Sequence, residues 1–153
     1  MSEAPAAAPP FRVQAVEYPR AMAELHGIRE AVFVREQQVP AELERDALDP
    51  ACLHVVARAL DGEAIGTGRL VPPSLDQPAK IGRMAVSQAM RGSRIGRHVL
   101  DALMKAARER GDQEAVLHAQ VSASAFYARA GFSERGSVFD EAGIPHVEMV
   151  RTL

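Results

Sequence analysis

Cysteine and tryptophan are almost missing from this chain of 153 residues, which holds one cysteine, Cys52, and no tryptophan. A single cysteine cannot form an internal disulfide, and it cannot supply a zinc or iron–sulfur cluster. We therefore expect a cytoplasmic protein without a bound metal. Aromatic residues make up only 5% of the chain, which argues against an aromatic platform for nucleic-acid bases.

Strong net charge and long apolar runs are missing too. The formal net charge of −2 gives no overall electrostatic reason to bind nucleic acid or an anionic membrane. No stretch approaches the roughly 18 uninterrupted apolar residues of a membrane helix. Residues 1–10 are rich in alanine and proline but lack the basic and apolar regions of a signal peptide, so we interpret them as a flexible tail.

Three common catalytic motifs are also absent. The segment Gly66-Thr67-Gly68 is followed by Val71 where a dinucleotide-binding loop needs its third glycine. The chain has no G-K-S/T ending of a phosphate-binding loop and no H-E-x-x-H metal motif. These absences exclude the corresponding classes of dehydrogenase, nucleotidase and metalloenzyme.

The hydrophobic pattern that is present predicts a single mixed α/β domain over residues 11–153, in the order strand, helix, three strands, helix, strand, helix, hairpin. A first helix is predicted from Arg20, a second from Ile95 to a glycine cap at Gly111, and a third with Ser122 as its N-cap. The predicted strands cover residues 11–18, 53–60, 64–71, 80–87, 114–120, 132–139 and 145–152.

The loop between the strand at 80–87 and the helix at Ile95 is rich in glycine and arginine. A loop that opens a helix is suited to anions, because free backbone N–H groups and the positive end of the helix dipole meet there. Between Lys80 and Arg110 there are eight Lys or Arg and two acids, a local sum of +6. By itself this pattern is also consistent with a solvated helix face beside a simple turn.

Two motifs in order make the interpretation specific. The segment Arg91, Gly92, Ser93, Arg94, Ile95, Gly96 resembles the R-x-x-G-x-G signature of the GNAT acetyltransferase superfamily, with Arg94 where the family usually has glycine. The segment Q-V-S-A-S-A-F-Y-A-R-A-G-F at residues 120–132 is similar to the second coenzyme-binding segment of that family, and residues 28–40 and 141–146 are similar to its ElaA-like branch.

The resemblance implies a central, mostly antiparallel twisted sheet of about seven strands with splayed central strands, flanked by helices. It implies acetyl-CoA as co-substrate, with the pantetheine arm beside Met84, Ala85 and Val86 and between the two splayed strands. The implied coenzyme-binding residues also include Gln120, Phe126, Tyr127 and the loop Arg91, Gly92, Ser93, Arg94, Ile95, Gly96, Arg97. The acceptor would be a primary amine of a small molecule or peptide, and a homodimer is left open.

The resemblance further implies that the Tyr127 hydroxyl protonates the departing thiolate, whereas helical spacing alone would place this ring in the core. An amine with a reference pKa of about 10.4 must also lose a proton before it attacks. We name His118 and Glu36 for this step, but the residue types leave several candidates open: Glu36, Glu42, His54, His118, His146 and Glu148.

The segment from Glu24 to Asp49 holds seven acids and three arginines, a local sum of −4. Its carboxylates could attract a cationic amine, although a solvated helix face is the simpler interpretation. Two other functions are kept: an acyl-CoA-binding module without transferase activity, and an acyl-homoserine-lactone synthase, to which the V-F-V-x-E-Q segment is similar.

Overall fold

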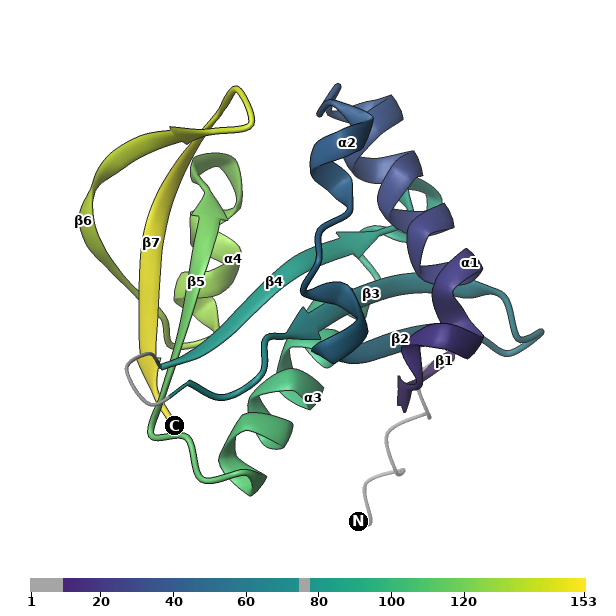
Figure 1. The fold of residues 1–153 in the computed structure, drawn as a ribbon, viewed down its shortest axis with the longest axis horizontal. Helices are drawn as coiled ribbons and strands as arrows, with labels where there is room; N and C mark the ends of the chain where they lie inside the picture. Colours follow the sequence, from purple (N-terminus) through teal and green to yellow (C-terminus); the bar gives the residue numbers. More distant parts are fainter. Residues whose placement is uncertain (1–9, 75–77) are drawn as a thin grey trace, which may run out of the picture.

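The computed structural model describes residues 10–74 and 78–153, so the predicted tail lies outside it except for Pro10. The strands form one sheet of seven in the order β1-β2-β3-β4-β5-β7-β6, antiparallel except for the β4–β5 pair. This confirms the expected fold class (Figure 1). The strands are β1 Phe11–Val16, β2 Leu53–Ala59, β3 Ala64–Leu70, β4 Ala79–Val86, β5 Glu114–Gln120, β6 Ser133–Glu141 and β7 Ile144–Thr152.

Strands β4 and β5 separate in the middle of the sheet. Their parallel pairing is limited to Ala79 with Ala115 and Lys80 with Val116, after which the two strands diverge. A bulge on β4 places Arg83 and Met84 opposite Gly68 of β3, and Arg83 takes a positive φ of 51°. Bulges bend a strand and increase its twist, which is consistent with β4 turning away from β5 here.

Helices cover the two faces of the β1–β4 half (Figure 1). Helix α1, Tyr18–Arg29, packs on Val56, and helix α3, Ile95–Glu109, packs in the main core with the neighbouring residues Val55 and Ala57. Because side chains alternate along a strand, α1 and α3 lie on opposite faces. Helix α4, Ser124–Arg129, follows β5, and α2 is the short helix Ala41–Glu44.

Two glycines of β3 bring α3 close to the sheet. A Cβ on Gly66 would lie 2.8 Å from Ile95 Cγ2, and one on Gly68 would lie 2.8 Å from Leu103 Cδ1. The pair rejected above as a dinucleotide loop therefore makes room for the helix that begins at the glycine- and arginine-rich loop.

The first helical region differs from the prediction. The helix begins at Tyr18, with Pro19 in its first turn, and continues as a π-helix over Glu30–Glu36. Proline suits the first turn of a helix because its missing N–H would have no partner there. Short helical segments follow at Ala41–Glu44 and Asp49–Ala51, which the sequence pattern did not indicate.

The start of α4 also corrects a prediction. Ser122 lies inside a 3₁₀ turn, Val121–Ala123, and does not cap the helix, which begins at Ser124. The Ser124 hydroxyl instead donates to the Val121 carbonyl at 2.9 Å. Gly111, with a φ of +95°, follows α3 as expected, and Ala142 and Gly143, with φ of 54° and 79°, form the turn between β6 and β7.

Candidate active site

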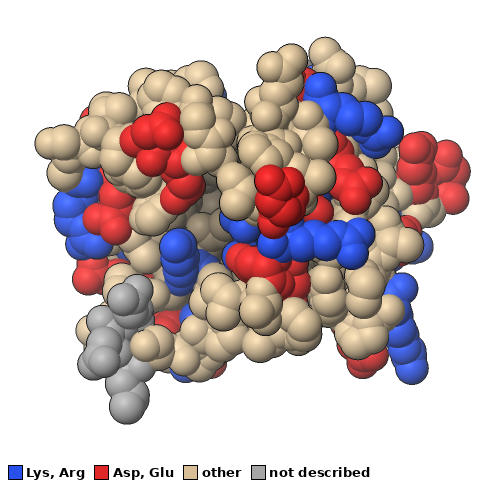
Figure 2. Space-filling view, turned by 45° about the horizontal axis from the view of Figure 1, so that its top comes forward, with Lys and Arg blue, Asp and Glu red and all other residues tan. Residues whose placement is uncertain are grey.

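The divergence of β4 and β5 opens a cleft of about 1260 Å³. In Figure 2 it is a notch between the half built on β1–β4 and the half built on β5–β7. Every coenzyme-binding residue that the family resemblance implies, Tyr127 included, lines this cleft except Ser93. Of the six candidate bases, Glu36, His118 and His146 line it, whereas Glu42, His54 and Glu148 do not.

The loop before α3 has the backbone that its glycine signature requires. Gly92 takes a φ of +87°, and Arg94 takes φ 66° and ψ 13° as the N-cap of α3. Arg94 therefore has the left-handed backbone conformation that glycine adopts readily. The loop keeps this conformation although a residue with a Cβ is strained in it. The first backbone N–H groups of α3, from Ile95 onward, have no partner within the helix.

The loop arginines differ in their contacts. Arg91 donates to both carboxylate oxygens of Glu36, with Nη2 to Oε1 at 2.7 Å, and this hydrogen bonding lowers the pKa of Glu36. Arg97 pairs with Asp101 at 2.9 Å on the same helix. Arg94 has no ion-pair partner within residues 10–74 and 78–153. Much of the loop's positive charge is thus already paired with acids.

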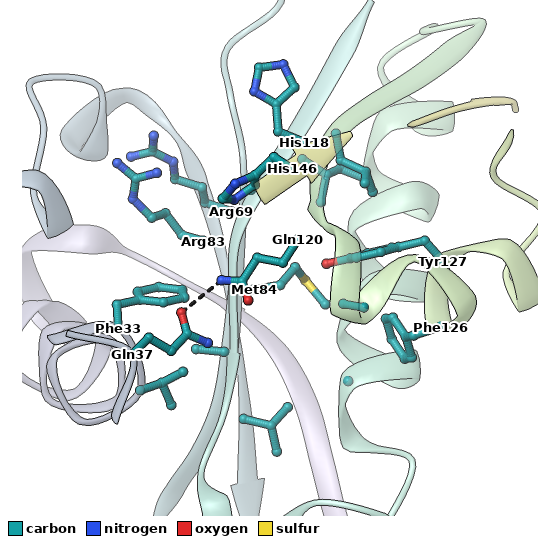
Figure 3. Close-up of a pocket in the computed structure, with 18 of the residues that line it drawn as sticks. Phe33, Gln37, Arg69, Arg83, Met84, His118, Gln120, Phe126, Tyr127 and His146 are labelled. Atoms are coloured by element: carbon teal, nitrogen blue, oxygen red, sulfur yellow. Dashed lines mark hydrogen bonds between the residues drawn. The ribbon is translucent and has the colours of Figure 1, made fainter. Parts of the chain in front are cut away.

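Tyr127 reaches the cleft from α4 with a mostly buried ring. It contacts Phe126 and Phe132 edge to face, at centroid distances of 5.0 and 6.1 Å. Burial raises the pKa of Tyr127 to about 12, so the phenol keeps its proton at neutral pH. Figure 3 shows its hydroxyl pointing into the pocket toward Met84, and in the described part of the chain no side chain accepts its hydrogen bond. Tyr127 therefore packs in the core and also reaches the cleft, and its role as the general acid stays a prediction.

The residues beside Tyr127 come from both walls. Gln120, at the end of β5, donates from Nε2 to Gln37 Oε1 at 2.8 Å across the cleft (Figure 3). Phe126 lies against Gly96 of α3, since a Cβ on that glycine would be 3.4 Å from the ring. At the end of the π-helix, Glu36 contacts Arg91 in the loop before α3, whereas Gln37 contacts Gln120 of β5 on the opposite wall.

Two histidines and a glutamate lie together at the other end of the cleft. His118 Nδ1 lies 3.0 Å from Glu141 Oε1, and His146 Nε2 lies 3.5 Å from Glu141 Oε2. His146 is directly opposite Gln120 in the β5–β7 register. In Figure 3 the His118 ring points away from Gln120 and Tyr127, whereas His146 lies nearer to Gln120.

The acidic segment from Glu24 to Asp49 is only in part a solvated face, because Glu30, Glu36 and Glu42 are exposed whereas two of its acids are buried. Glu44 and Asp49 are buried, and Arg29, also buried, lies 2.9 Å from Asp49 Oδ1 and bonds Glu44. Arg69 bonds two acids of this segment: its Nη1 lies 2.8 Å from Asp49 Oδ1, and its Nη2 lies 2.6 Å from Asp46 Oδ2. These ion pairs hold residues 41–51, which form part of the cleft wall, against α1 and β3.

The pKa of Asp49 reflects this network. Burial alone would raise it, but hydrogen bonds and charge from Arg29 and Arg69 outweigh burial and hold it well below its usual range. Sequence reasoning missed the network because pairing arginines on α1 and β3 with acids of one loop depends on long-range contacts. The excess of acids between residues 24 and 49, matched by arginines elsewhere, was the only available signal.

Gln37, Arg69, Arg83 and Glu141 were also not predicted for the cleft. Gln37, in the segment 28–40, and Glu141, in the E-A-G-I-P-H segment, lie in motifs that could have indicated them. Among the described residues, no group of three or more His, Cys, Asp or Glu is arranged to hold a metal ion. In the same part of the chain, no helix is both long and apolar enough to cross a membrane.

Comparisons with known proteins agree with this geometry. Residues 9–153 match the acetyltransferase (GNAT) domain family. The chain is 39% identical to the uncharacterized N-acetyltransferase YjcF of Bacillus subtilis over 128 residues, covering 81% of this chain and 87% of YjcF. It is 32% identical to protein ElaA of Escherichia coli over 129 residues, covering 82% and 84% of the two chains.

Solved structures show the same fold. The crystal structure of Escherichia coli ElaA superposes with a TM-score of 0.82 and covers 92% of this chain and 99% of ElaA, at 28% identity. An aminoglycoside 6'-N-acetyltransferase complexed with coenzyme A shares the fold, with a TM-score of 0.72 at 17% identity, covering 92% and 96% of the chains. The chain belongs to the GNAT family of acyl-CoA N-acyltransferases, is similar to ElaA, and is an acyltransferase.

Proposed function

We propose that this protein transfers the acetyl group of acetyl-CoA to a primary amine by direct attack of the amine on the thioester. The observation that carries the proposal is the cleft itself. It has an anion-binding loop with unpaired helix N–H groups at one end and a buried phenol with an unused proton at its centre. A phosphate-bearing thioester fits these two features together.

The coenzyme would lie along β4. Past Lys80, β4 has no partner in β5, so the backbone of Met84, Ala85 and Val86 is placed to pair with the pantetheine arm. Arg91, Gly92, Ser93, Arg94, Ile95, Gly96 and Arg97 would surround the pyrophosphate. Gln120 and Phe126 would contact the arm from the β5 side.

Tyr127 would act as the general acid. As the carbon–sulfur bond breaks, its hydroxyl gives a proton to the coenzyme thiolate. Its raised pKa keeps that proton in place throughout the neutral range. Near the apolar ring contacts, water competes little for the hydrogen bond to sulfur.

Glu36 and His118 would serve as positioning residues, although the sequence nominated both for proton transfer. Both oxygens of Glu36 accept hydrogen bonds from Arg91, which sets that guanidinium beside the coenzyme loop. His118 bonds Glu141, and its ring points away from Tyr127. The two ring nitrogens of His118 thus face carboxylates, with Nδ1 beside Glu141 and Nε2 3.9 Å from Glu148 Oε1.

A reaction of the purified protein with acetyl-CoA and a mixture of primary amines tests the function. We expect acetylated amine by mass spectrometry and stoichiometric release of coenzyme thiol. Saturable acetyl-CoA binding without thiol release for any amine would instead identify a binding module. Release only with an acyl-carrier protein and S-adenosylmethionine would identify a lactone synthase.

We also propose that residues 11–153 form one catalytic domain that works in the cytoplasm on a small-molecule or peptide amine. Light scattering of the purified chain at several concentrations distinguishes a monomer from the homodimer left open by the sequence. Limited proteolysis tests the domain boundary, because a single domain resists cleavage between residue 11 and the C-terminus.

A further inference from the structure

His146 is held in one tautomer by the backbone of its own strand. Its Nδ1 lies 2.7 Å from the Ile144 carbonyl oxygen, which can only accept a hydrogen bond. The Nδ1 atom must therefore carry a hydrogen, and in the neutral ring the lone pair is on Nε2. This ring is buried, with 7% of its surface exposed, and it stacks on Phe139 at a centroid distance of 6.0 Å.

The Nε2 lone pair faces a second acceptor. Glu141 Oε2 is 3.5 Å away, while Glu141 Oε1 is already engaged by His118 Nδ1 at 3.0 Å. Two acceptor atoms thus face each other without a donor between them. A primary ammonium group carries three N–H donors and a positive charge, and therefore suits both atoms.

The turn between β6 and β7 fixes this pair. Ala142 and Gly143 both have positive φ, which is the geometry of a two-residue hairpin turn, and Glu141 pairs with Ile144 across it. Alanine rarely adopts the left-handed region, because its Cβ comes too close to the following carbonyl oxygen there. The strained residue Ala142 thus directly follows Glu141, which lines the cleft.

Of the two histidines that line the cleft, His146 lies nearer to Gln120 (Figure 3). It is opposite Gln120, the residue that bridges the cleft beside Tyr127, whereas His118 is opposite Glu148, two residues farther from the strand end. The charged groups around His146 are Glu141 on β6 and, through it, His118 on β5. Arg69 and Arg83 also line the cleft, but their guanidinium groups bond Asp46.

We propose that His146 is the general base and that Glu141 binds the ammonium form of the acceptor; this rests on the proposed function. Nε2 of His146 takes one proton from the ammonium group, and the freed nitrogen lone pair forms the C–N bond. The C–S bond breaks as Tyr127 gives its proton to the thiolate. The second amine proton replaces the one that Tyr127 gave, so one proton per turnover leaves through His146.

Thiol release with n-butylamine and benzylamine as probe amines tests this. His146→Gln should lower kcat/KM at neutral pH by at least ~100-fold while retaining acetyl-CoA affinity. The loss should shrink as the pH approaches 10, where more of the amine is already neutral, and imidazole should partly rescue His146→Gly. Glu141→Gln should mainly raise KM. His98→Gln, at an exposed histidine on α3, is the matched control.

The outcomes separate the two proposals. If the wild type releases no thiol with any amine, the proposed function fails. If the wild type is active and His146→Gln matches it, or if only His118→Gln loses the neutral-pH rate, His146 is not the base. Nitrogen NMR of isotope-labelled histidine gives an answer without turnover, because an Nε2–H tautomer for His146 would overturn the inference.

Discussion

Tyr127 combines a structural and a chemical role in one side chain. Its ring packs on Phe126 and Phe132, and its hydroxyl has no partner among the described residues. Tyr127→Phe keeps the packing and removes only the proton donor. We expect kcat to fall tenfold or more, with acetyl-CoA affinity within about twofold of the wild type.

The pH dependence of that effect follows from burial. Because burial raises the pKa of Tyr127 to about 12, its proton remains bound across the neutral and mildly alkaline range. The ratio of wild-type to Tyr127→Phe turnover should therefore stay constant between about pH 7 and about pH 10. A ratio that collapses within this range would show that another group is the acid.

Arg94 carries backbone strain that the family's usual glycine would not. Its φ of 66° costs roughly 1 kcal/mol for a residue with a Cβ. Arg94→Gly should raise the free energy of unfolding by up to about 1 kcal/mol, reduced by the added freedom of the unfolded chain. Arg94→Ala is the control, because it keeps the strain and removes the same charge.

Both Arg94 variants should bind acetyl-CoA more weakly than the wild type, as measured by calorimetry. In a denaturant titration, only Arg94→Gly should be more stable than the wild type. Equal stability of the two variants would mean that the left-handed backbone at this position carries no strain. Unchanged coenzyme affinity would mean that Arg94 makes no phosphate contact.

At the scale of elements, the close contact of α3 with β3 sets where the glycine- and arginine-rich loop lies. A methyl group on Gly68 would meet Met84 Sδ at 2.7 Å, Leu103 Cδ1 at 2.8 Å and Val99 Cγ1 at 3.0 Å. Gly68→Ala must therefore displace these side chains, of which Val99 and Leu103 are fully buried. We expect a loss of about 1–3 kcal/mol in unfolding free energy.

Gly82→Ala is the matched control, since a Cβ there meets no atom within 4 Å. Its unfolding free energy should stay within about 1 kcal/mol of the wild type, with a gain more expected than a loss. Similar losses for both variants would show that strand flexibility, and not the approach of α3, explains the glycine at position 68.

At the scale of the whole molecule, a buried ionic network joins the first helix, the loop after it and the sheet. Asp49→Asn leaves Arg29 and Arg69 without their shared carboxylate, and both arginines are buried. Breaking a buried pair in this way typically costs about 3–5 kcal/mol. Glu109→Gln, which removes an exposed i,i+4 pair with Lys105, should change stability by less than about 1 kcal/mol.

The same network predicts how the free energy of unfolding depends on pH. Asp46 and Asp49 have pKa values below those of the unfolded chain, so the folded state binds fewer protons. Their stabilisation is complete above about pH 4 and is lost as the pH falls below it. Burial lowers the pKa of His54, so the unfolded chain binds a proton here more readily than the folded state does. This residue therefore also reduces the stability of the fold as the pH falls below about 6.5.

Denaturant titrations at several pH values check this dependence. The wild type should lose stability more steeply below about pH 4 than Asp49→Asn, so the difference between the two should narrow in acid. A difference that stays constant down to about pH 2 would show that Asp49 does not titrate with the unfolding transition.

The sequence alone determined most of the strands, helix α3, the turn at Ala142-Gly143 and the glycine- and arginine-rich loop before α3. These features depend on alternation, helical periodicity and glycine at positions of positive φ, all of which act over a few neighbouring residues. The family resemblance added one mostly antiparallel sheet of about seven strands and the splay of its central strands, and the structure supplied the strand order. Residues of both motifs, 91–96 and 120–132, line the same cleft.

Only the tertiary structure decided which side chains share that cleft. The pairing of Glu36 with Arg91 joins residues 55 positions apart, and the Arg29, Asp49 and Arg69 pairs join three elements. The choice between His118 and His146 also depends on strand register and on a backbone carbonyl that fixes a tautomer. Local patterns name residue types that can do the chemistry, but only long-range packing sets their distances and directions.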